Sequence, residues 1–547
     1  MQDHDLYVSG DPLDRLIAQS RELPSWDLTP RQACDTELLL NGAFAPLDGF
    51  MTGDECRSVQ DKKRWQDHFW PLPVYLDVSE ACAGALEIGD PLALRDQEGV
   101  LVAVITIADK FPASAIASDA ERNSASNPGS NPVCIGGQLQ GIEAPAHHDF
   151  KRRRLSPREL RRQFDKLGWR KVLGYATRQP LHQREVNETY NASRKIEANL
   201  LLNPAVGAVQ PEDALHYAQV HCYEQVLDHF PGQTTDLAIL PLYSRCAGLD
   251  DALLHALVLK NLGCTHYMVD RGYCAMAETG MNYSQVQEAL SAYNQKLGIE
   301  LVFNERMVYS ARRGGYVERA TVADGELVNE LTTEEFAGRL RSHLAVPDWY
   351  TWPEIVSELG KIYRPCSEQG VTIFFTGLSG SGKSSIANAV LVKMMEMGGR
   401  PITLLDGDVV RQNLSSELGF SKEHRDLNIR RIGYVASQIT KHGGMAICAP
   451  IAPYTRTRRD VREMVEQVGG FVEVYVSTPL EICEQRDRKG LYAKARAGII
   501  KEFTGISDPY EEPEYPEVRI DTEGISPEEA AQRVILTLEK LGYIKTI

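Results

Sequence analysis

The stretch Gly377-Leu-Ser-Gly-Ser-Gly-Lys-Ser384 matches the phosphate-binding pattern G-x-x-x-x-G-K-S and decides the fold expected around it. It follows an apolar run, 371–376, that predicts a buried strand. It precedes 385–395, where apolar residues recur at helical spacing. Between a strand and a helix, the glycines let backbone N–H groups turn towards a phosphate, and the helix N-terminus adds its positive dipole end. The sequence therefore predicts a nucleotide-binding P-loop.

Within this loop the polar residues have predicted roles. Lys383 is expected to reach the β- and γ-phosphates of ATP, and Ser384 is expected to hold the Mg²⁺ that accompanies the nucleotide. The residues of the loop predicted to contact ATP are Gly377, Ser379, Gly380, Ser381, Gly382, Lys383, Ser384 and Ser385.

A second predicted strand, 401–405, ends in Asp406-Gly-Asp408, and Arg411 follows three residues later. A carboxylate at the carboxyl end of a strand beside a P-loop is positioned to hold Mg²⁺ or to accept a proton. We therefore predict that Asp408 is catalytic together with Lys383 and that it shares the metal with Ser384.

Length and composition limit the class of protein. At 547 residues the chain is too long for one core, and about three domains are expected. A net charge of −16 argues against nucleic-acid binding, because phosphate contacts need a basic surface. The sequence contains no apolar run of about 18 residues, so it predicts no membrane span. The 11 cysteines contain no C-x-x-C pair and the first residues include no apolar signal segment, so we expect a cytoplasmic protein with reduced thiols.

The pattern along the chain predicts four segments, 1–167, 168–330, 331–367 and 368–547. The first contains short strand-like runs at 70–76 and 100–106 and predicts a mostly β domain. In the second, strand-like runs alternate with helical stretches, which favours a parallel sheet with crossover helices. The third predicts a small helical segment and linker, and the fourth predicts the α/β domain that carries the P-loop.

Motifs downstream of the P-loop carry a close family resemblance. They are D-G-D-x-x-R at 406–411, Phe420, R-x-x-N at 425–428, I-A-P at 451–453, K-G-L-Y at 489–492 and F-T-G-I at 503–506. Their order resembles adenosine 5′-phosphosulfate (APS) kinase over 371–545. The resemblance implies transfer of the ATP γ-phosphate to the 3′-hydroxyl of APS, giving 3′-phospho-APS (PAPS), with ATP, APS and Mg²⁺ as ligands.

The same resemblance implies roles for individual residues. The residues it assigns to APS are Asp408, Arg411, Phe420, Arg425, Asn428, Ile451, Ala452, Lys489 and Phe503. Planar guanidinium forks suit the oxyanions of a phosphosulfate, and a base stacked on an aromatic ring gains about 1–3 kcal/mol. Arg486 and Lys489 lie in the segment that resembles the family's lid, where Arg486 is expected to contact ATP and closure excludes water. Some family members carry a phosphorylatable serine where this chain has Ala452, so direct transfer from ATP to APS is expected.

The N-terminal part resembles ATP sulfurylase (sulfate adenylyltransferase) from about 30 to 360. The resemblance is carried by the stretches 39–51, 144–150, 260–266 and 346–354. It implies a PUA-like N-terminal domain, a central Rossmann-like nucleotidyltransferase domain and assembly into a homo-oligomer through the sulfurylase-like region.

The sulfurylase catalytic motifs are altered. The family pattern Q-T-R-N-P-x-H-x-x-H corresponds to 176–185, which keeps Arg178 and His182 but has Glu185 in place of the second histidine. The family loop G-R-D-H-A aligns with 270–274, where Asp270 replaces glycine and only Arg271 is kept.

These replacements put carboxylates where the reaction needs donors to ATP phosphates. Two like charges at ~4 Å repel by ~4 kcal/mol at an effective dielectric constant of about 20. We therefore predict an APS kinase carried on a sulfurylase-like domain without useful activity, which serves as a scaffold or as a regulatory binding site. Two alternatives remain open: a bifunctional PAPS synthetase whose altered site is compensated, and a pair of regulatory nucleotide-binding modules without catalysis.

Overall fold

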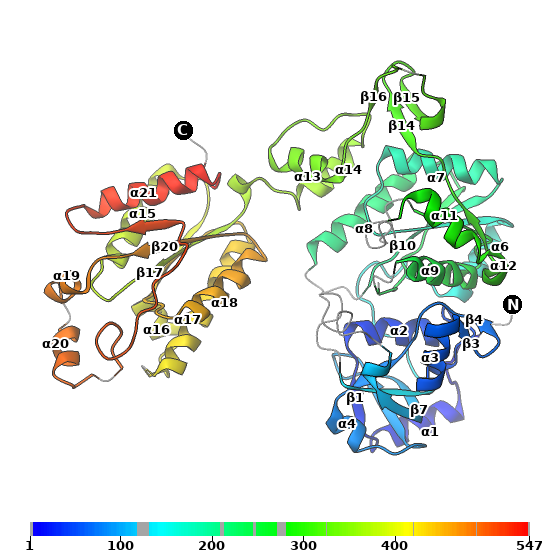
Figure 1. Cartoon of the computed structure of the whole chain (residues 1–547), viewed down its shortest axis with the longest axis horizontal. Helices are drawn as coiled ribbons and strands as arrows, with labels where there is room; N and C mark the ends of the chain where they lie inside the picture. Colours follow the sequence, from blue (N-terminus) through cyan, green and yellow to red (C-terminus); the bar gives the residue numbers. More distant parts are fainter. Residues whose placement is uncertain are drawn as a thin grey trace. The chain divides into compact units, whose positions relative to one another are not determined.

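The structure is a computed structural model that describes residues 4–116, 131–207, 213–243, 245, 248–270, 281–323, 325–419, 421–487, 490–500 and 502–544. The chain forms two compact units, residues 1–332 with 346–362 and residues 333–345 with 363–547 (Figure 1). The predicted α/β class is confirmed in both units. In the described part of the chain, no helix combines the length and apolarity needed to cross a membrane.

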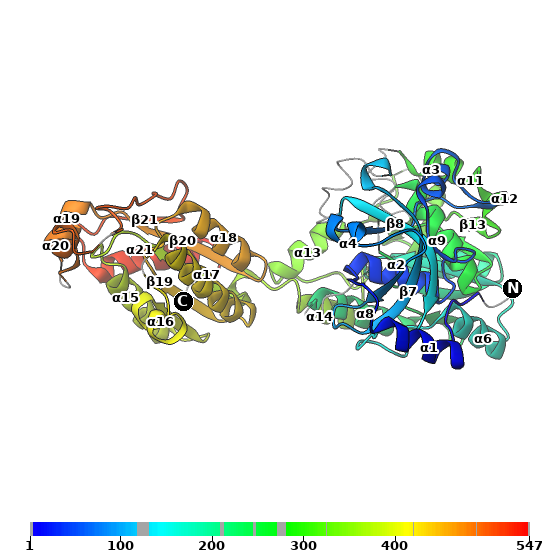
Figure 2. The ribbon, with the colours of Figure 1, turned by 90° about the horizontal axis from the view of Figure 1, so that it is seen from below.

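A twisted mixed sheet forms the N-terminal domain (Figure 2). Its strands are β1 (Ser25–Asp27), β6 (Pro91–Arg95), β7 (Leu101–Pro112), β8 (Val133–Gly141) and β2 (Gly49–Phe50), with β5 (Leu76–Val78) paired to β8. The predicted strand at 100–106 is confirmed by β7. The predicted strand at 70–76 is wrong except for its last residue, because Pro71 and Pro73 have no N–H to donate to a ladder.

Helices and one hairpin complete this domain and lead into the next. They are α1 (Asp11–Ser20), α2 (Pro30–Leu40), α3 (Gly53–Lys62), the β3 (Arg64–Trp65) and β4 (His68–Phe69) hairpin, α4 (Glu80–Gly84) and α6 (Pro157–Leu167).

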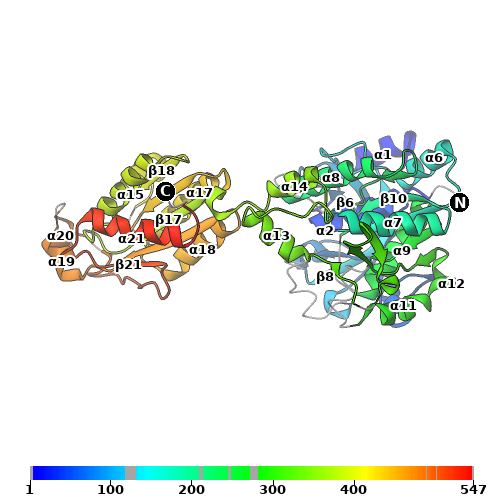
Figure 3. The same cartoon turned by 90° about the horizontal axis from the view of Figure 1, so that it is seen from above.

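The central domain has the predicted parallel sheet. Its order is β11 (Thr235–Leu237), β10 (Asn199–Pro204), β9 (Val172–Thr177), β12 (His266–Met268) and β13 (Glu300–Val302). In Figures 1 and 3, α7 (Gln183–Lys195) and α8 (Ala214–Val226) lie on one face, and α9 (Leu249–Leu262) lies on the other. The chain leaves β9 and β12, which are neighbours, at the same edge of the sheet, where ligands bind in such folds.

Smaller elements follow the central sheet. They are α11 (Tyr283–Ser291), α12 (Asn294–Leu297), the antiparallel strands β14 (Met307–Ser310), β15 (Gly315–Glu318) and β16 (Val328–Asn329), and the helices α13 (Thr333–Arg341) and α14 (Pro353–Gly360). The helical character predicted for 331–367 is present, but α13 belongs to the second unit and α14 to the first.

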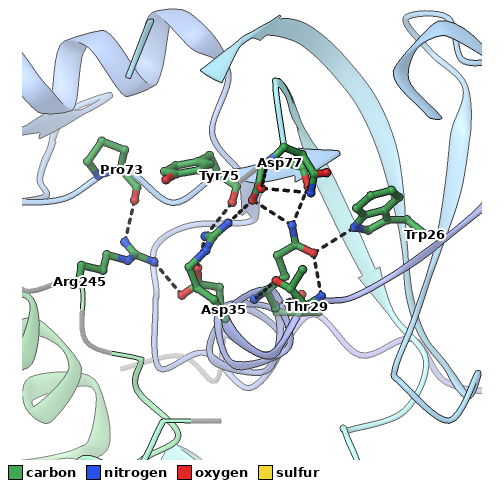
Figure 4. A network of polar contacts seen from close by, with 11 residues as sticks. Trp26, Thr29, Asp35, Pro73, Tyr75, Asp77 and Arg245 are labelled. Atoms are coloured by element: carbon green, nitrogen blue, oxygen red, sulfur yellow. Dashed lines mark hydrogen bonds and ion pairs between the residues drawn. The ribbon is translucent and has the colours of Figure 1, made fainter. Parts of the chain in front are cut away.

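A buried polar network ties the N-terminal domain to the segment that precedes α9 (Figure 4). Arg31 on α2 donates to Asp35 Oδ2 at 3.1 Å and also to Asp77. Arg245 donates to Asp35 Oδ1 at 2.7 Å and to the carbonyl of Pro73 at 2.7 Å. Side chains that complete the network are those of Gln32 and Asn131. Because each buried charge faces an opposite one, the desolvation cost is offset by ion pairs.

The second unit is built on a five-stranded parallel sheet with the order β18-β19-β17-β20-β21. The strands are β17 (Val371–Thr376), β18 (Ile402–Asp406), β19 (Met445–Ala449), β20 (Gly470–Val476) and β21 (Val518–Ile520). The helices are α15 (Lys383–Met397), α16 (Gly407–Leu414), α17 (Lys422–Lys441), α18 (Thr455–Glu466), α19 (Leu480–Gln485), α20 (Leu491–Arg496) and α21 (Pro527–Lys540). In Figure 1, α15 and α21 cover one face, and α17 and α18 cover the other.

The buried network generates a test of stability. Replacing Asp77 by alanine removes one carboxylate from Arg31, whose guanidinium stays buried beside Asp35, and breaking such a pair costs about 3–5 kcal/mol. We expect a clearly lower thermal midpoint for the first unit of Asp77→Ala, measured by calorimetry on the full chain. The control is Asp54→Ala, which breaks the exposed pair with Arg57; equal midpoints for the two variants would contradict the expectation.

Candidate active site

Backbone shape fixes the loop between β17 and α15. Gly377 and Gly380 have φ values of +146° and +75°, which side-chain-bearing residues rarely adopt. A Cβ on Gly377 would lie 2.5 Å from the carbonyl oxygen of Val476, and one on Gly380 would lie 3.0 Å from that of Cys483. The loop thus needs glycine here both for its φ values and for its close approach to the neighbouring backbone.

Lys383, the first residue of α15, is drawn into this loop. Its Nζ donates to the carbonyls of Gly377 at 2.9 Å and Leu378 at 2.7 Å, and the residue is 7% exposed. Burial lowers the pKa of Lys383 to about 8, against the nearby Cys483 and Asp406, which raise it. A largely desolvated ammonium within a glycine-rich turn is suited to pairing with a polyphosphate.

The predicted metal residue Ser384 has an acidic neighbour that the sequence reasoning did not select. Its Oγ donates to Asp406 Oδ2 at 3.0 Å. A hydroxyl and a carboxylate are hard oxygen donors of the kind that Mg²⁺ prefers, and P-loop enzymes hold the ion with these two residue types. The pair therefore fits the ion. Asp406 was recognisable as the last residue of β18, whereas Asp408 lies on α16 and its side chain is outside the described part.

Arg425, which is largely buried, and Asn428, which is buried, lie one turn apart on α17. Nε of Arg425 and Oδ1 of Asn428 are buried without a hydrogen-bond partner among the described residues. The structure thus brings together the two ends of the predicted R-x-x-N motif. Buried polar atoms are nearly always paired, so atoms left unpaired are expected to meet a ligand.

The segment after β19 passes against the start of the P-loop. The backbone N–H of Gly377 donates to the carbonyl of Ile451 at 3.3 Å, and Thr376 Oγ1 lies 2.8 Å from the same oxygen. Ala452 has a φ of +45° and is buried, and Arg458 donates to its carbonyl at 2.8 Å. These bonds place the predicted residues Ile451 and Ala452 beside the phosphate loop.

The lid-like segment reaches the P-loop through two residues that were not predicted. Arg486 donates to Thr522 Oγ1 at 2.7 Å, and that hydroxyl lies 3.1 Å from the carbonyl of Ser381. Tyr492 donates to the carbonyl of Ser379 at 2.8 Å. The K-G-L-Y motif contained Tyr492, but no local pattern indicated Thr522, which follows β21.

The other predicted residues are placed as follows. The ring of Phe503 stands edge-on to that of Tyr492, with centroids 5.0 Å apart. Arg411 donates to the carbonyl of Gly419 at 3.0 Å. Phe420, Lys489 and Arg271 lie outside the described residues. A cavity of about 580 Å³ opens beside the loop and is lined by Leu378, Thr478, Leu480, Ile506, Asp508 and Tyr510 among others.

In the first unit, the altered sulfurylase-like motif follows β9. His182 Nδ1 lies 3.0 Å from Thr351 Oγ1, and its ring centroid is 4.5 Å from that of Tyr350. Burial lowers the pKa of His182 to about 4, against Glu185, which raises it. The imidazole is therefore neutral at pH 7 and adds no positive charge to the motif.

The position of Glu185 corrects one part of the sequence argument. Its Oε2 accepts the backbone N–H of His182 at 3.1 Å, which caps the N-terminus of α7, and its Oε1 accepts Arg184 Nε at 3.0 Å. The carboxylate is thus neutralised by an arginine and by a helix end. The repulsion of ~4 kcal/mol estimated for an uncompensated charge does not apply to this conformation.

Asp270 follows β12, next to β9 in the sheet. The pKa of Tyr175 is raised mainly by burial and next by the negative charge of Asp270. The same two causes, in the same order of size, raise the pKa of Tyr267. Asp270, two residues beyond β12, is therefore near enough to act electrostatically on both buried tyrosines, and it adds negative charge at this edge of the sheet.

Comparisons with known proteins agree with this layout. Family models match for a PUA-like domain at 3–134, ATP-sulfurylase at 151–362 and adenylylsulphate kinase at 369–521. A sulfate adenylyltransferase of Mycosarcoma maydis is 38% identical over 99% of this chain and 98% of its own length. A sulfate adenylyltransferase of Phaeosphaeria nodorum is also 38% identical, over 97% of this chain and 96% of its own length. The hexameric APS kinase from Thiobacillus denitrificans superimposes with a TM-score of 0.85 at 38% identity, covering 100% of this chain and 98% of that one.

The burial of Lys383 generates a pH test. Because its pKa in the free protein is about 8, the ammonium is progressively lost above that pH, and a bound triphosphate favours the charged form. We expect ATP binding to weaken as pH rises through 8 and to take up a proton there. Calorimetry in two buffers of different ionisation enthalpy measures this uptake.

Matched variants identify the residue responsible. Lys383→Arg stays charged at these pH values and should lose the proton uptake. Lys393→Arg, at an exposed position of the same helix, should retain it. Equal uptake in all three proteins would show that another group titrates.

Proposed function

The chain belongs to the family of proteins that join an ATP sulfurylase domain to an APS kinase domain, and we propose that its catalytic activity is the kinase reaction. ATP and APS would give ADP and PAPS. The observation that carries this proposal is the pairing of a complete phosphate loop with the unpartnered atoms of Arg425 and Asn428 on α17. One half suits a triphosphate and the other suits the anionic end of a second substrate.

The proposed reaction is an in-line transfer. The 3′-hydroxyl oxygen of APS forms a bond to the γ-phosphorus while the bond to the β-phosphate bridging oxygen breaks, and the hydroxyl proton passes to Asp408. Lys383 pairs with the triphosphate. Ser384, with Asp406 and Asp408, would hold Mg²⁺, which neutralises charge on the β- and γ-phosphates when bound.

APS would be recognised at both of its ends. Arg411, Arg425 and Asn428 would contact the phosphosulfate, with the Ile451–Ala452 backbone beside them. The predicted aromatic residues would stack on the adenine, and Arg486 and Lys489 would close over the nucleotides. Exclusion of water matters because water competes with APS as phosphoryl acceptor.

We further propose that the sulfurylase-like domain makes no APS at a useful rate. Support comes from the loss of a motif histidine at Glu185, from a neutral His182, and from the carboxylate of Asp270. A relative of the same two-domain length carries the name APS kinase alone and is hexameric. The domain would then serve to assemble kinase domains into a homo-oligomer.

The second candidate is a bifunctional PAPS synthetase. One specific observation favours it: the charge of Glu185 is paired with Arg184 and does not stand uncompensated. The fungal relatives are named for the sulfurylase reaction.

The kinase proposal predicts the effect of removing the proposed base. Asp408→Ala should reduce PAPS formation from ATP and APS by about 10²–10⁴-fold, the usual contribution of a positioned acid or base. The measurement is turnover of purified full-length protein, with circular dichroism to confirm an intact fold. Near-normal turnover would remove Asp408 from the mechanism.

The two candidates are separated by a second assay. With ATP, Mg²⁺, sulfate and pyrophosphatase, we expect neither APS nor PAPS above the rate of a protein-free control, while added APS is converted to PAPS. Product from sulfate at an ordinary enzymatic rate, about 1 s⁻¹ or more, would instead establish the bifunctional enzyme.

A further inference from the structure

We infer that Asp508 is a positioning residue for APS, because it holds the guanidinium of Arg425 so that one edge remains available to the substrate. The inference rests on the proposed kinase function and deepens it. Asp508 lies two residues beyond the F-T-G-I motif and was not among the predicted site residues.

The hydrogen bonds of Arg425 divide its guanidinium into an occupied and an open part. Nη1 donates to Thr504 Oγ1 at 2.8 Å and to Asp508 Oδ2 at 3.0 Å, so both of its hydrogens are used. Nη2 donates to the hydroxyl of Tyr454 at 2.7 Å. Nε is buried and has no partner in the described part of the chain. The N–H left for an anion is therefore that of Nε, together with the second hydrogen of Nη2.

Tyr454 closes the arrangement. Its hydroxyl donates a hydrogen bond to the same Oδ2 of Asp508 at 2.8 Å. A lone pair of the hydroxyl oxygen then accepts the hydrogen bond from Arg425 Nη2. Burial raises the pKa of Tyr454, and the hydrogen bond to Asp508 raises it further, so the phenol keeps its proton. Arg425, Tyr454 and Asp508 form a triangle in which the carboxylate accepts two hydrogen bonds.

Partial burial strengthens the ion pair between Arg425 and Asp508 and fixes the arginine before substrate binds. The side chains of Arg425 and Asp508 are 12% and 15% exposed, so their attraction is screened less than that of a surface pair. An arginine has many rotamers, and fixing one of them has an entropic cost. The pair meets that cost before substrate arrives and holds α17 against the 503–510 loop, where Phe503 and the 580 Å³ cavity also lie.

A carboxylate near an anionic substrate has a second, opposite effect. Its charge repels the phosphosulfate, and removing it would strengthen binding if repulsion outweighed positioning. Asp508 contacts Nη1, on the occupied edge of the planar guanidinium, whereas the unpartnered Nε belongs to the other edge. The geometry therefore points to positioning as the larger effect, and the sign of the change in KM for APS decides between the two.

The experiment measures kcat and both KM values for full-length variants in the kinase assay. For Asp508→Ala we expect KM for APS to rise roughly 10-fold to 100-fold, because a hydrogen bond to a charged group typically changes a binding constant by about that factor and Arg425 would no longer be held to make it. Asp508→Asn keeps an acceptor oxygen and should fall between alanine and wild type. Asp508→Glu should restore most of the affinity. KM for ATP and kcat should change less than about twofold, since Lys383 and its loop are untouched.

A matched control changes the carboxylate partner of another arginine on α17. Asp460 on α18 pairs with Arg430 on α17 at 2.8 Å, and these side chains are 35% and 46% exposed. Asp460→Asn removes the same charge from an exposed pair and should leave both KM values unchanged.

Each alternative result overturns the inference. An unchanged or lowered KM for APS in Asp508→Ala and Asp508→Asn would show that the carboxylate does not position Arg425. A parallel rise in both KM values together with a lower thermal midpoint would show a structural role only. Wild-type protein is assayed in the same series. If it fails to convert APS, the kinase proposal itself is wrong. If the wild type is active and the variants are unaffected, only the positioning role of Asp508 is rejected.

Discussion

A buried ammonium among backbone carbonyls is the constraint on which the second unit depends. Lys383 can occupy its place only because the P-loop wraps around it, and that wrap requires left-handed glycines packed against the ends of β20 and α19. Thr478 and Thr522 then hold the carbonyl of Ser381 from the neighbouring strands' ends. The parallel sheet supplies these ends side by side, so the loop, the sheet order and the low pKa of the lysine are parts of one arrangement.

Buried charges in this protein are of two kinds, and the difference is informative. In the N-terminal network, Arg31, Arg245, Asp35 and Asp77 face one another, and each has partners within the protein. Such a network stabilises the fold and leaves nothing for a ligand. On α17, by contrast, Arg425 and Asn428 each keep one buried polar atom unsatisfied. Other buried polar atoms of the described residues also have no partner, and these two differ in lying on residues of the R-x-x-N motif, close to the P-loop side of the sheet, which supports the proposal that a second substrate contacts them.

The sulfurylase-like site shows how a substitution can acquire a structural use. Glu185 stands where the family pattern has histidine, and its carboxylate caps the helix that begins beside the motif while pairing with Arg184. The replacement therefore costs the fold little, since a capping glutamate stabilises a helix N-terminus. The replacement removes a histidine that could donate a hydrogen bond and carry a positive charge. The buried, neutral His182 does not supply that charge in its place. The proposed loss of sulfurylase activity is thus compatible with retention of the fold at this side chain.

The sequence by itself determined the elements whose cause is local. The run of glycines and Gly-Lys-Ser after an apolar strand fixed β17, the P-loop and α15, and the spacing of Arg425 and Asn428 put them one turn apart on a helix. The order of motifs determined the family and the α/β class. A strand at 70–76 was not obtained, because the prolines in it outweigh its apolar residues.

Only the tertiary structure decided which of these residues meet. Ser384 meets Asp406 although β19 lies between β17 and β18, Arg486 reaches Ser381 through Thr522, and Arg425 is held by Asp508, 83 residues away. It also decided that Glu185 faces Arg184 and the end of its own helix. Periodicity and motif spacing report on neighbours along the chain, whereas hydrogen bonds depend on atoms within about 3 Å of one another, and that proximity is set by how parallel strands and their crossover helices pack.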